Sequence, residues 1–226
     1  MSPKKRTKSK IPFNIHFGKI PTVFIGREEI REEIIDSFYE DNGVYRTSFI
    51  TGLRGMGKTV LLTDIALNLK SEKDWVVVNT ASSDKFLENI LGNLQLEASE
   101  KLASFTDLIQ SINLSFPGFG VGFGRTSPET PKNFQSLVLK LVRALDENGI
   151  GVLFTIDEVT NSEQMREFAT TYQLLVRENY DICLLMAGLP QNIDELLSDD
   201  VLTFLRRATR IELSNLDISA VSLTYN

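Results

Sequence analysis

The sequence has almost none of the residues on which most metal and thiol chemistry depends. Among its 226 residues there is one cysteine, Cys183, and one histidine, His16. A single cysteine excludes a disulfide within the chain and a multi-cysteine metal cluster, and a single histidine leaves a histidine-based triad or a zinc site without enough ligands. The chemistry of this protein must therefore rest on other residue types.

Long apolar stretches are also missing. No run approaches the roughly 18 to 20 apolar residues that a membrane-spanning helix needs, and the basic N-terminus is not followed by an apolar signal segment. We therefore expect a cytoplasmic protein without a membrane partner. With 42% hydrophobic and 24% charged residues, the chain fits one globular domain with a core of its own.

The net charge of -6 is unevenly placed, because five cations and no acid lie within the first ten residues. The rest of the chain is therefore more acidic than the total suggests, whereas a folded surface that grips duplex DNA usually carries an excess of basic residues. The basic run is typical of a solvated tail. The alternative is a tail that contacts phosphate or an acidic lipid surface.

Short apolar runs with the length of buried strands alternate with segments of helical periodicity, which favours a parallel sheet covered on both faces. The predicted strands are residues 47–51, 75–79, 152–156, 182–187 and 209–213. The first helix is predicted to start near Arg27, and later ones to cover 58–69, 84–111 with a break near Ala98, 133–147, 162–178 and 191–197. Aromatic residues and glycines at 114–124 predict a small inserted β-hairpin, either a finger that reaches a partner or a flap that packs on the domain.

Residues 52–59 carry the motif that decides the class. They read Gly-Leu-Arg-Gly-Met-Gly-Lys-Thr and match G-x-x-x-x-G-K-[ST], directly after an apolar strand and before an amphipathic helix. Glycines allow the tight turn that aims backbone N–H groups inward, and the helix N-terminus adds a positive dipole end where phosphate binds. The motif predicts that Lys58 reaches the β- and γ-phosphates of a nucleotide and that the Thr59 hydroxyl ligates Mg²⁺.

The cofactor-binding residues expected from this loop are Gly52, Arg54, Gly55, Met56, Gly57, Lys58, Thr59 and Val60. Arg54 has two interpretations, since it either adds positive charge near the nucleotide or faces solvent.

An acidic pair follows the predicted strand at 152–156. In the expected site, Asp157 holds Mg²⁺ through water, and Glu158 orients and deprotonates an attacking water. An Asp-Glu pair after a strand also suits an ordinary helix-capping loop. Its combination with the loop at 52–59 favours the catalytic interpretation.

With these two motifs, the chain resembles an AAA+ P-loop ATPase of the group related to origin-recognition initiators and STAND signalling ATPases. Residues 24–28, Phe-Ile-Gly-Arg-Glu, resemble the segment of that group that lies against adenine, which implies that Gly26 and Arg27 contact the base. The alternative is a plain helix start. Residues 204–213 resemble the region in which the group places arginines before its last strand.

The resemblance implies that Arg207 or Arg206 reaches the γ-phosphate in a neighbouring subunit, because a guanidinium pairs well with phosphate oxygens. Such a finger implies a homo-oligomer. The alternative is a surface arginine pair at a helix end.

The resemblance also implies an α/β fold, a three-layer αβα P-loop NTPase with a five-stranded parallel sheet in the order 5-1-4-3-2. ATP is then expected at the carboxyl ends of the strands. The ATPase domain would cover 21–217, after a basic tail and irregular arm at 1–20. Residues 218–226 would start a truncated lid or form a C-terminal tail, so that the helical lid of the group is absent.

A second departure concerns the expected fourth strand, which leads into Gly188-Leu189-Pro190 where the group has a polar sensor, with Gln191 and Asn192 nearby. We therefore expect an ATP-binding domain that hydrolyses Mg-ATP slowly to drive a conformational or assembly switch. One alternative is a DNA-associated initiator or loader in which ATP gates nucleic-acid binding. Another is a STAND-like signalling scaffold with little turnover and a protein partner.

Overall fold

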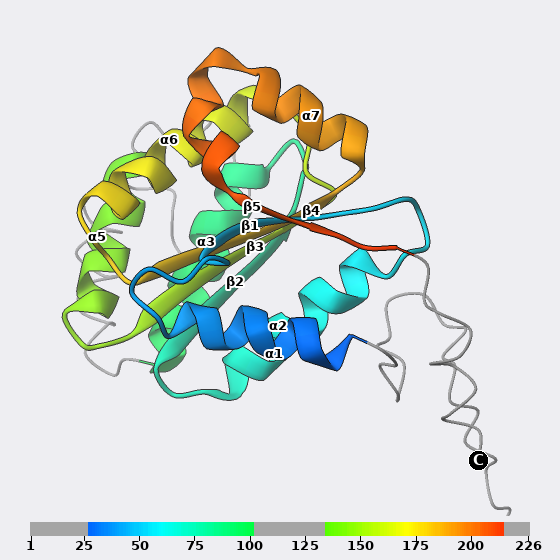
Figure 1. Cartoon of the computed structure of the whole chain (residues 1–226). Coiled ribbons are helices and arrows are strands. Elements are labelled where there is room, and N and C mark those ends of the chain that lie inside the picture. The colour runs from blue at the N-terminus through cyan, green and yellow to red at the C-terminus, as the bar shows by residue number, and fades with distance from the viewer. Residues whose placement is uncertain (1–26, 102–133, 215–226) are drawn as a thin grey trace, which may run out of the picture.

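The computed structural model describes residues 27–101 and 134–214, and Figure 1 traces their path. Several expectations concern residues outside these two ranges and stay predictions. They are the tail and arm at 1–20, the base contact of Gly26, the hairpin at 114–124 and the lid or tail at 218–226. The last part of the helix predicted for 84–111 also lies outside them.

Five parallel strands form one sheet through the centre of the molecule (Figure 1). Their order, β2-β3-β4-β1-β5, confirms the expected order 5-1-4-3-2, read from the opposite edge. The strands are β1 (Thr47–Thr51), β2 (Trp75–Ala81), β3 (Gly151–Asp157), β4 (Ile182–Gly188) and β5 (Thr209–Glu212). Each lies close to its predicted range, and a continuous apolar run marks β2, β3 and β4.

Helices cover both faces of this sheet, which confirms the three-layer arrangement. One face carries α1 (Glu28–Phe38) and α2 (Lys58–Ser71). The other face carries α3 (Phe86–Lys101), α5 (Phe134–Asp146), α6 (Glu163–Arg177), α7 (Pro190–Ser198) and the 3₁₀ helix η1 (Asp200–Arg207). The predicted break near Ala98 is wrong, because this residue is a strong helix former and is fully buried in an unbroken α3.

Successive side chains of each strand point to opposite faces and so divide the interior into two cores. In β2, Val76 and Val78 belong to the core under α3, α5 and α6, whereas Trp75 and Val77 belong to the core under α1 and α2. Both sets of side chains are buried. In the middle of the sheet, β4 is buried along its whole length, as a sheet covered on both sides requires, whereas the edge strand β5 buries only Ile211.

Aromatic rings hold the core on the α6 side. The ring of Phe168 lies 5.7 Å from that of Phe86 and 5.5 Å from that of Phe154, both edge to face. Tyr172, one turn further along α6, stacks on Phe168 with ring centroids 6.2 Å apart. Edge-to-face pairs add to the free energy gained from burial. Phe168 thus connects α3, β3 and α6.

The core on the α1–α2 side contains the one cysteine of the chain. Cys183 lies in β4 with no exposed surface, among Ile65 of α2, Leu153 of β3 and Leu185 of its own strand. Burial raises the pKa of the Cys183 thiol far above its ordinary value. The thiol therefore behaves as a small apolar side chain of the core.

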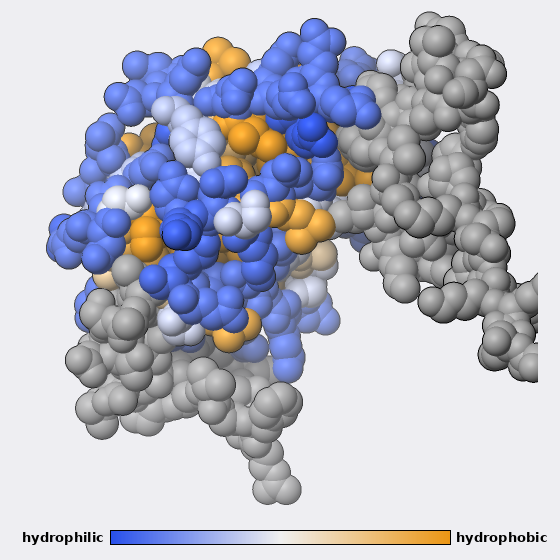
Figure 2. Space-filling model, turned by 90° about the horizontal axis from the view of Figure 1, so that it is seen from below, coloured by the Kyte–Doolittle hydropathy of each residue, from blue (hydrophilic) through white to orange (hydrophobic). Residues whose placement is uncertain are grey.

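The surface on the α1–α2 side is mostly hydrophilic, with small hydrophobic areas that polar residues separate (Figure 2). Across the two described ranges, none of the helices is both long enough and apolar enough to cross a membrane.

Replacing Phe168 with Ala should destabilise the protein by about 3–5 kcal/mol, because the change removes a buried ring on which three elements pack. The free energy of unfolding, measured by urea denaturation, checks this. Val176→Ala is the matched control, since this residue lies on the same helix but is 50% exposed. It should change stability by no more than about 0.5 kcal/mol. Equal losses for both variants would contradict the role given to the aromatic cluster.

Candidate functional site

The loop between β1 and α2 folds as a tight turn that only glycine adopts easily. Gly55 and Gly57 have φ angles of 80° and 83°, in the left-handed region. Gly57 is also the N-cap of α2, and no side chain caps that helix. The first N–H groups of α2 therefore have no side-chain partner and stay available to an anion.

Gly52 is required at the start of this loop for a different reason. A Cβ atom at this position would lie 2.7 Å from the carbonyl oxygen of Leu213, the residue directly after β5. The Leu213 N–H in turn donates to the carbonyl oxygen of Thr51 at 2.8 Å. The end of β5 thus supports the loop from one side.

Lys58, the first residue of α2, turns its ammonium group back onto the loop. Its Nζ donates to the carbonyl oxygens of Gly52 and Leu53 at 2.8 and 2.9 Å. Burial lowers the pKa of Lys58 below its ordinary value, the carboxylates of Asp157 and Glu158 oppose this shift, and Arg54 adds to it. The ammonium group is therefore held by neutral acceptors, which an anionic ligand can replace.

Asp157 and Glu158 lie where β3 ends, at the same end of the strands as the glycine loop. The N–H of Glu158 donates to Oδ1 of Asp157 at 2.9 Å, and Glu158 adopts a φ of 50°, which is unusual for a residue with a side chain. The next residue, Val159, is buried, and its N–H donates to the carbonyl oxygen of Ala187 at 2.9 Å. The backbone therefore holds the two carboxylates against the end of β4.

One strand separates the acidic pair from the glycine loop. In the sheet β4 pairs with both β3 and β1, and neighbouring strands are about 4.8 Å apart. The backbones at Asp157 and at the start of the loop are therefore about 10 Å apart. The strand topology thus brings the two motifs to the same end of the sheet.

The residues expected to bind magnesium fit a shared site better than a protein-only one. The side chain of Thr59 is exposed in the first turn of α2, and that of Asp157 is partly exposed. In the part of the chain that the structure describes, no three His, Cys, Asp or Glu side chains gather as a metal site. Mg²⁺ normally takes one or two protein ligands together with phosphate oxygens and water, and these two residues suit that pattern.

The other positions expected to touch the nucleotide lie on the loop and in the first turn of α2. Arg54 is exposed at the tip of the loop, whereas Met56 and Val60 are partly buried on either side of Lys58. Met56 packs against the core on the α1–α2 side. The loop thus presents one cation outward and anchors itself with an apolar side chain.

Arg27 is buried close to this loop. It is 8% exposed, and its Nη2 donates to the carbonyl oxygen of Ser214 at 3.0 Å, next to the Leu213 carbonyl that lies against Gly52. Burial lowers the pKa of its guanidinium. Within residues 27–101 and 134–214, its buried Nη1 has no hydrogen-bond partner. The contact of Arg27 with a base stays a prediction.

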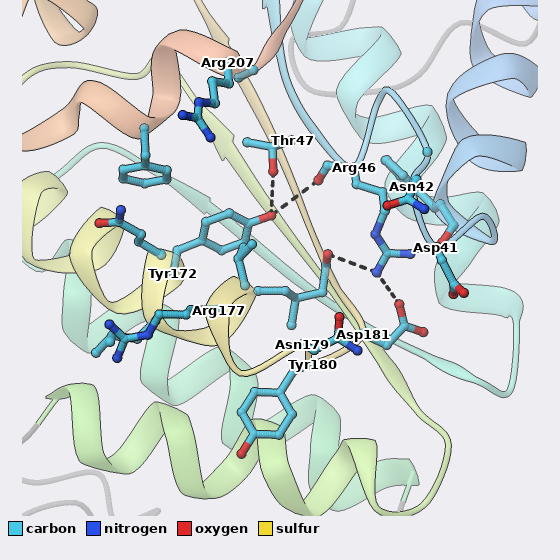
Figure 3. Close-up of a pocket in the computed structure, with 18 of the residues that line it drawn as sticks. Asp41, Asn42, Arg46, Thr47, Tyr172, Arg177, Asn179, Tyr180, Asp181 and Arg207 are labelled. Atoms are coloured by element: carbon cyan, nitrogen blue, oxygen red, sulfur yellow. Dashed lines mark hydrogen bonds and ion pairs between the residues drawn. The ribbon is translucent and has the colours of Figure 1, made fainter.

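Arg206 and Arg207 lie at the opposite end of the strands, because they precede β5 while the glycine loop follows β1. The Nε of Arg206 donates to the carbonyl oxygen of Leu197 in α7 at 2.8 Å. Arg207 is exposed and lines a groove of about 1290 Å³ (Figure 3). A strand of five residues spans roughly 15 Å, so neither arginine lies beside the glycine loop of its own chain.

The groove beside Arg207 was not anticipated from the sequence. Its floor contains an ion pair between Arg46 and Asp181 at 2.5 Å, and a hydrogen bond between Thr47 and the hydroxyl of Tyr172 at 2.8 Å (Figure 3). Arg46 and Asp181 directly precede β1 and β4, Thr47 is the first residue of β1, and Tyr172 belongs to α6. No sequence motif indicates these residues, because only the fold brings them together.

The end of β4, where the family resemblance implies a polar sensor, carries Gly188, which is packed against Val159. A Cβ atom on Gly188 would lie 2.7 Å from Cγ1 of Val159. The nearest amide, Nδ2 of Asn192 in α7, donates to the carbonyl oxygen of Val159 at 3.3 Å. Asn192 therefore contacts the backbone directly after Glu158.

Comparisons with known proteins agree with this arrangement. A family profile described as an AAA domain matches residues 45–197, about two thirds of the chain. No curated protein matches the sequence.

Among solved structures, the fold is similar to that of Cdc6p from Pyrobaculum aerophilum, with a TM-score of 0.57 and 16% identity over 93% of this chain and 51% of that one. It is also similar to the ADP form of the Aeropyrum pernix ORC2 protein, with a TM-score of 0.52 and 14% identity over 93% and 54% of the two chains. Drosophila ORC bound to DNA gives a TM-score of 0.51 and 14% identity over 88% and 45%. The chain thus spans about half the length of each of these proteins.

Two glycine substitutions test the conformation of the loop. A Cβ atom would meet nothing within 4 Å at either Gly57 or Gly92, so backbone conformation alone decides the effect. Gly57→Ala should destabilise by about 1–2 kcal/mol, because φ is left-handed there. Gly92→Ala should stabilise by about 0.5–1 kcal/mol, because this residue lies inside helix α3. Thermal unfolding measures both, and a stabilising Gly57→Ala would contradict the loop geometry.

Proposed function

Because this chain belongs to the AAA domain family, we propose that it binds ATP with magnesium at the loop between β1 and α2 and hydrolyses it slowly. The observation that supports this most directly is the loop itself. Its left-handed Gly55 and Gly57 lead into an uncapped helix, with the Lys58 ammonium held only by backbone carbonyls. Backbone N–H groups and one cation around a concave turn suit a chain of phosphates.

Each residue of the loop has a distinct role in this proposal. Lys58 exchanges its two carbonyl acceptors for β- and γ-phosphate oxygens, which form stronger, charge-assisted hydrogen bonds. The N–H groups of the first turn of α2 donate to the same phosphates. Arg54 adds positive charge at the loop. Gly52, Met56 and Val60 define the shape of the surface around the phosphates.

Magnesium, when bound, would neutralise charge that develops on the phosphate oxygens. The Thr59 hydroxyl and, through water, Asp157 would hold it. Glu158, exposed beside Asp157, is the general base that orients a water molecule and takes its proton. Phosphoryl transfer of this kind needs positioning and charge stabilisation and no covalent intermediate on the protein.

Slow turnover follows from the end of β4. The strand ends at Gly188, which packs on Val159, and the amide of Asn192 is already bonded to the Val159 carbonyl. The end of β4 itself thus contributes no polar side chain, and Asn192 would have to give up its bond to the Val159 carbonyl in order to orient the attacking water. Nucleotide state would then act mainly as a switch of conformation or assembly.

Arg207 is the candidate for completing the site from a second copy of the chain. It is exposed, and it lies at the end of the strands opposite the glycine loop, so it is distant from the nucleotide of its own subunit. The proposal requires an assembly in which this end of one subunit lies against the glycine loop of the next. A homo-oligomer would thus place Arg207 beside a neighbour's γ-phosphate.

Two alternatives share the same nucleotide site. The cations within residues 1–10 support an initiator or loader in which ATP gates DNA binding. The apolar sensor position supports a signalling scaffold that holds nucleotide with little turnover. Phosphate release measured with and without duplex DNA separates them, because only the first predicts stimulation by DNA.

The central test is a pair of substitutions at the site. Lys58→Ala should weaken ATP affinity about 100-fold, because the β- and γ-phosphates lose their charge-assisted partner. Glu158→Gln should leave the affinity unchanged and lower turnover about 100-fold, since the amide cannot take a proton. Fluorescent-nucleotide titration and phosphate release measure the two effects.

Lys70→Ala is the matched control for this test, because Lys70 lies on the same helix and pairs with Glu97 at 2.5 Å, far from the loop. It should bind ATP as the wild type does. Undiminished affinity in Lys58→Ala would remove the proposed function.

Replacing Arg207 with Ala should reduce turnover to about a thousandth and leave ATP affinity unchanged, if it completes a neighbour's site. Arg177→Ala is its control, because Arg177 is also an exposed arginine of the groove but belongs to α6, and turnover should change less than about twofold. Mixing the Lys58→Ala and Arg207→Ala proteins should restore part of the activity. No restoration, with both proteins folded, would contradict action between subunits.

A further inference from the structure

Asp199 joins three segments of the chain through one carboxylate. It lies between α7 and η1, and its side chain is 11% exposed. Its Oδ1 accepts from the N–H of Val201 at 2.9 Å, while its Oδ2 accepts from Nε of Arg166 at 2.7 Å and from Nδ2 of Asn161 at 3.2 Å. The backbone N–H of Val201 and the side chain of Arg166 lower the pKa of Asp199. The group is therefore an anion with three donors.

The Asn161 bond connects this carboxylate to the loop of the acidic pair. Asn161 lies three residues after Glu158, between buried Val159 and Ser162, whose Oγ accepts from the N–H of Met165 to cap α6. The Oδ1 atom of Asn161 is buried and has no partner in the part of the chain described. Asp199 is thus the group that orients the Asn161 amide.

At its other end, the same carboxylate fixes η1. Asp199 is the N-cap of this helix, and the Nε of Arg206 in its last turn donates to the carbonyl oxygen of Leu197. A cap bond at the start and a side-chain bond near the end hold η1, whose backbone bends at Leu202 between them. Arg207 is the last residue of the helix, so its position depends on how η1 is held.

We propose that Asp199 is a positioning residue that couples the loop carrying Glu158 to the helix carrying Arg207. The inference rests on the proposed function for its meaning, because it links the group that activates water to the group offered to a neighbour. A change at one end alters the free energy of the other, and such coupling is reciprocal. Neither residue touches the other, so the carboxylate transmits the effect.

The substitution Asp199→Asn separates the link from the helix cap. The Oδ1 of the asparagine still accepts from Val201, whereas the NH₂ group that replaces Oδ2 cannot accept from Arg166 or Asn161. The matched control is Asp194→Asn. Asp194 also pairs with an arginine, Arg210, at 2.8 Å, but it is 62% exposed and has no bond to the Glu158 loop.

Hydrogen exchange tests the link without nucleotide. In the full chain, Asp199→Asn should speed amide exchange about tenfold in both residues 158–162 and residues 200–208, because both lose charge-assisted support. Asp194→Asn should speed exchange in neither segment. Faster exchange confined to 200–208 would show that Asp199 serves η1 alone and would overturn the inference.

Turnover supplies a readout that a purely local structural role would not move. Asp199→Asn should lower kcat about tenfold with unchanged ATP affinity, because Glu158 is displaced and the phosphate loop is not. Asn161→Ala should give the same loss, and the double variant no further loss, as expected for one shared route. Additive losses would overturn the inference. If the wild type neither binds ATP nor releases phosphate, the proposed function fails, while hydrogen exchange still decides whether the link exists.

Discussion

The parallel direction of all five strands is the constraint on which the rest of the structure depends. It places the residues that follow each strand at the carboxyl end of the sheet, and the residues that precede each strand at its amino end. The glycine loop after β1, the acidic pair at the end of β3 and the apolar end of β4 therefore meet, although about a hundred residues separate the loop from the acidic pair and about thirty separate that pair from the end of β4. The same constraint keeps Arg46, Asp181 and Arg207 at the amino end of the strands. Two chemically different surfaces result from one topological rule.

Within the site, the charge and hydrogen bonds of Lys58 show how the carboxyl end of the sheet is organised to accept an anion. Burial disfavours its charge, yet two backbone carbonyls at 2.8 and 2.9 Å satisfy the ammonium group. The loop is thus stable as it stands, and it loses little when phosphate oxygens take over, since the donors are already oriented. Preorganisation of this kind reduces the reorganisation needed on binding. The proposed nucleotide site is consistent with this energetic arrangement.

The sequence predicted the strands and the loop well because each carries a local signal. Apolar runs mark β2, β3 and β4, and the spacing of Gly52, Gly57 and Lys58 marks the turn. The strand order came from the family resemblance and is confirmed. The 3₁₀ helix η1 and the bonds of Asp199 were missed, because a short 3₁₀ helix lacks the 3.6-residue periodicity and the partners lie 2, 33 and 38 positions away. The roles of the individual site residues stay predictions.

The burial of Cys183 in the middle of β4 has a practical consequence for the study of this molecule. A thiol with no exposed surface and a strongly raised pKa is protonated at neutral pH, and it reacts poorly with maleimides. A cysteine introduced on η1 or beside Glu158 would then be the only site to take up a dye or spin label, with the natural residue left in the core. Distances between chosen points can therefore be followed in solution without first redesigning the interior.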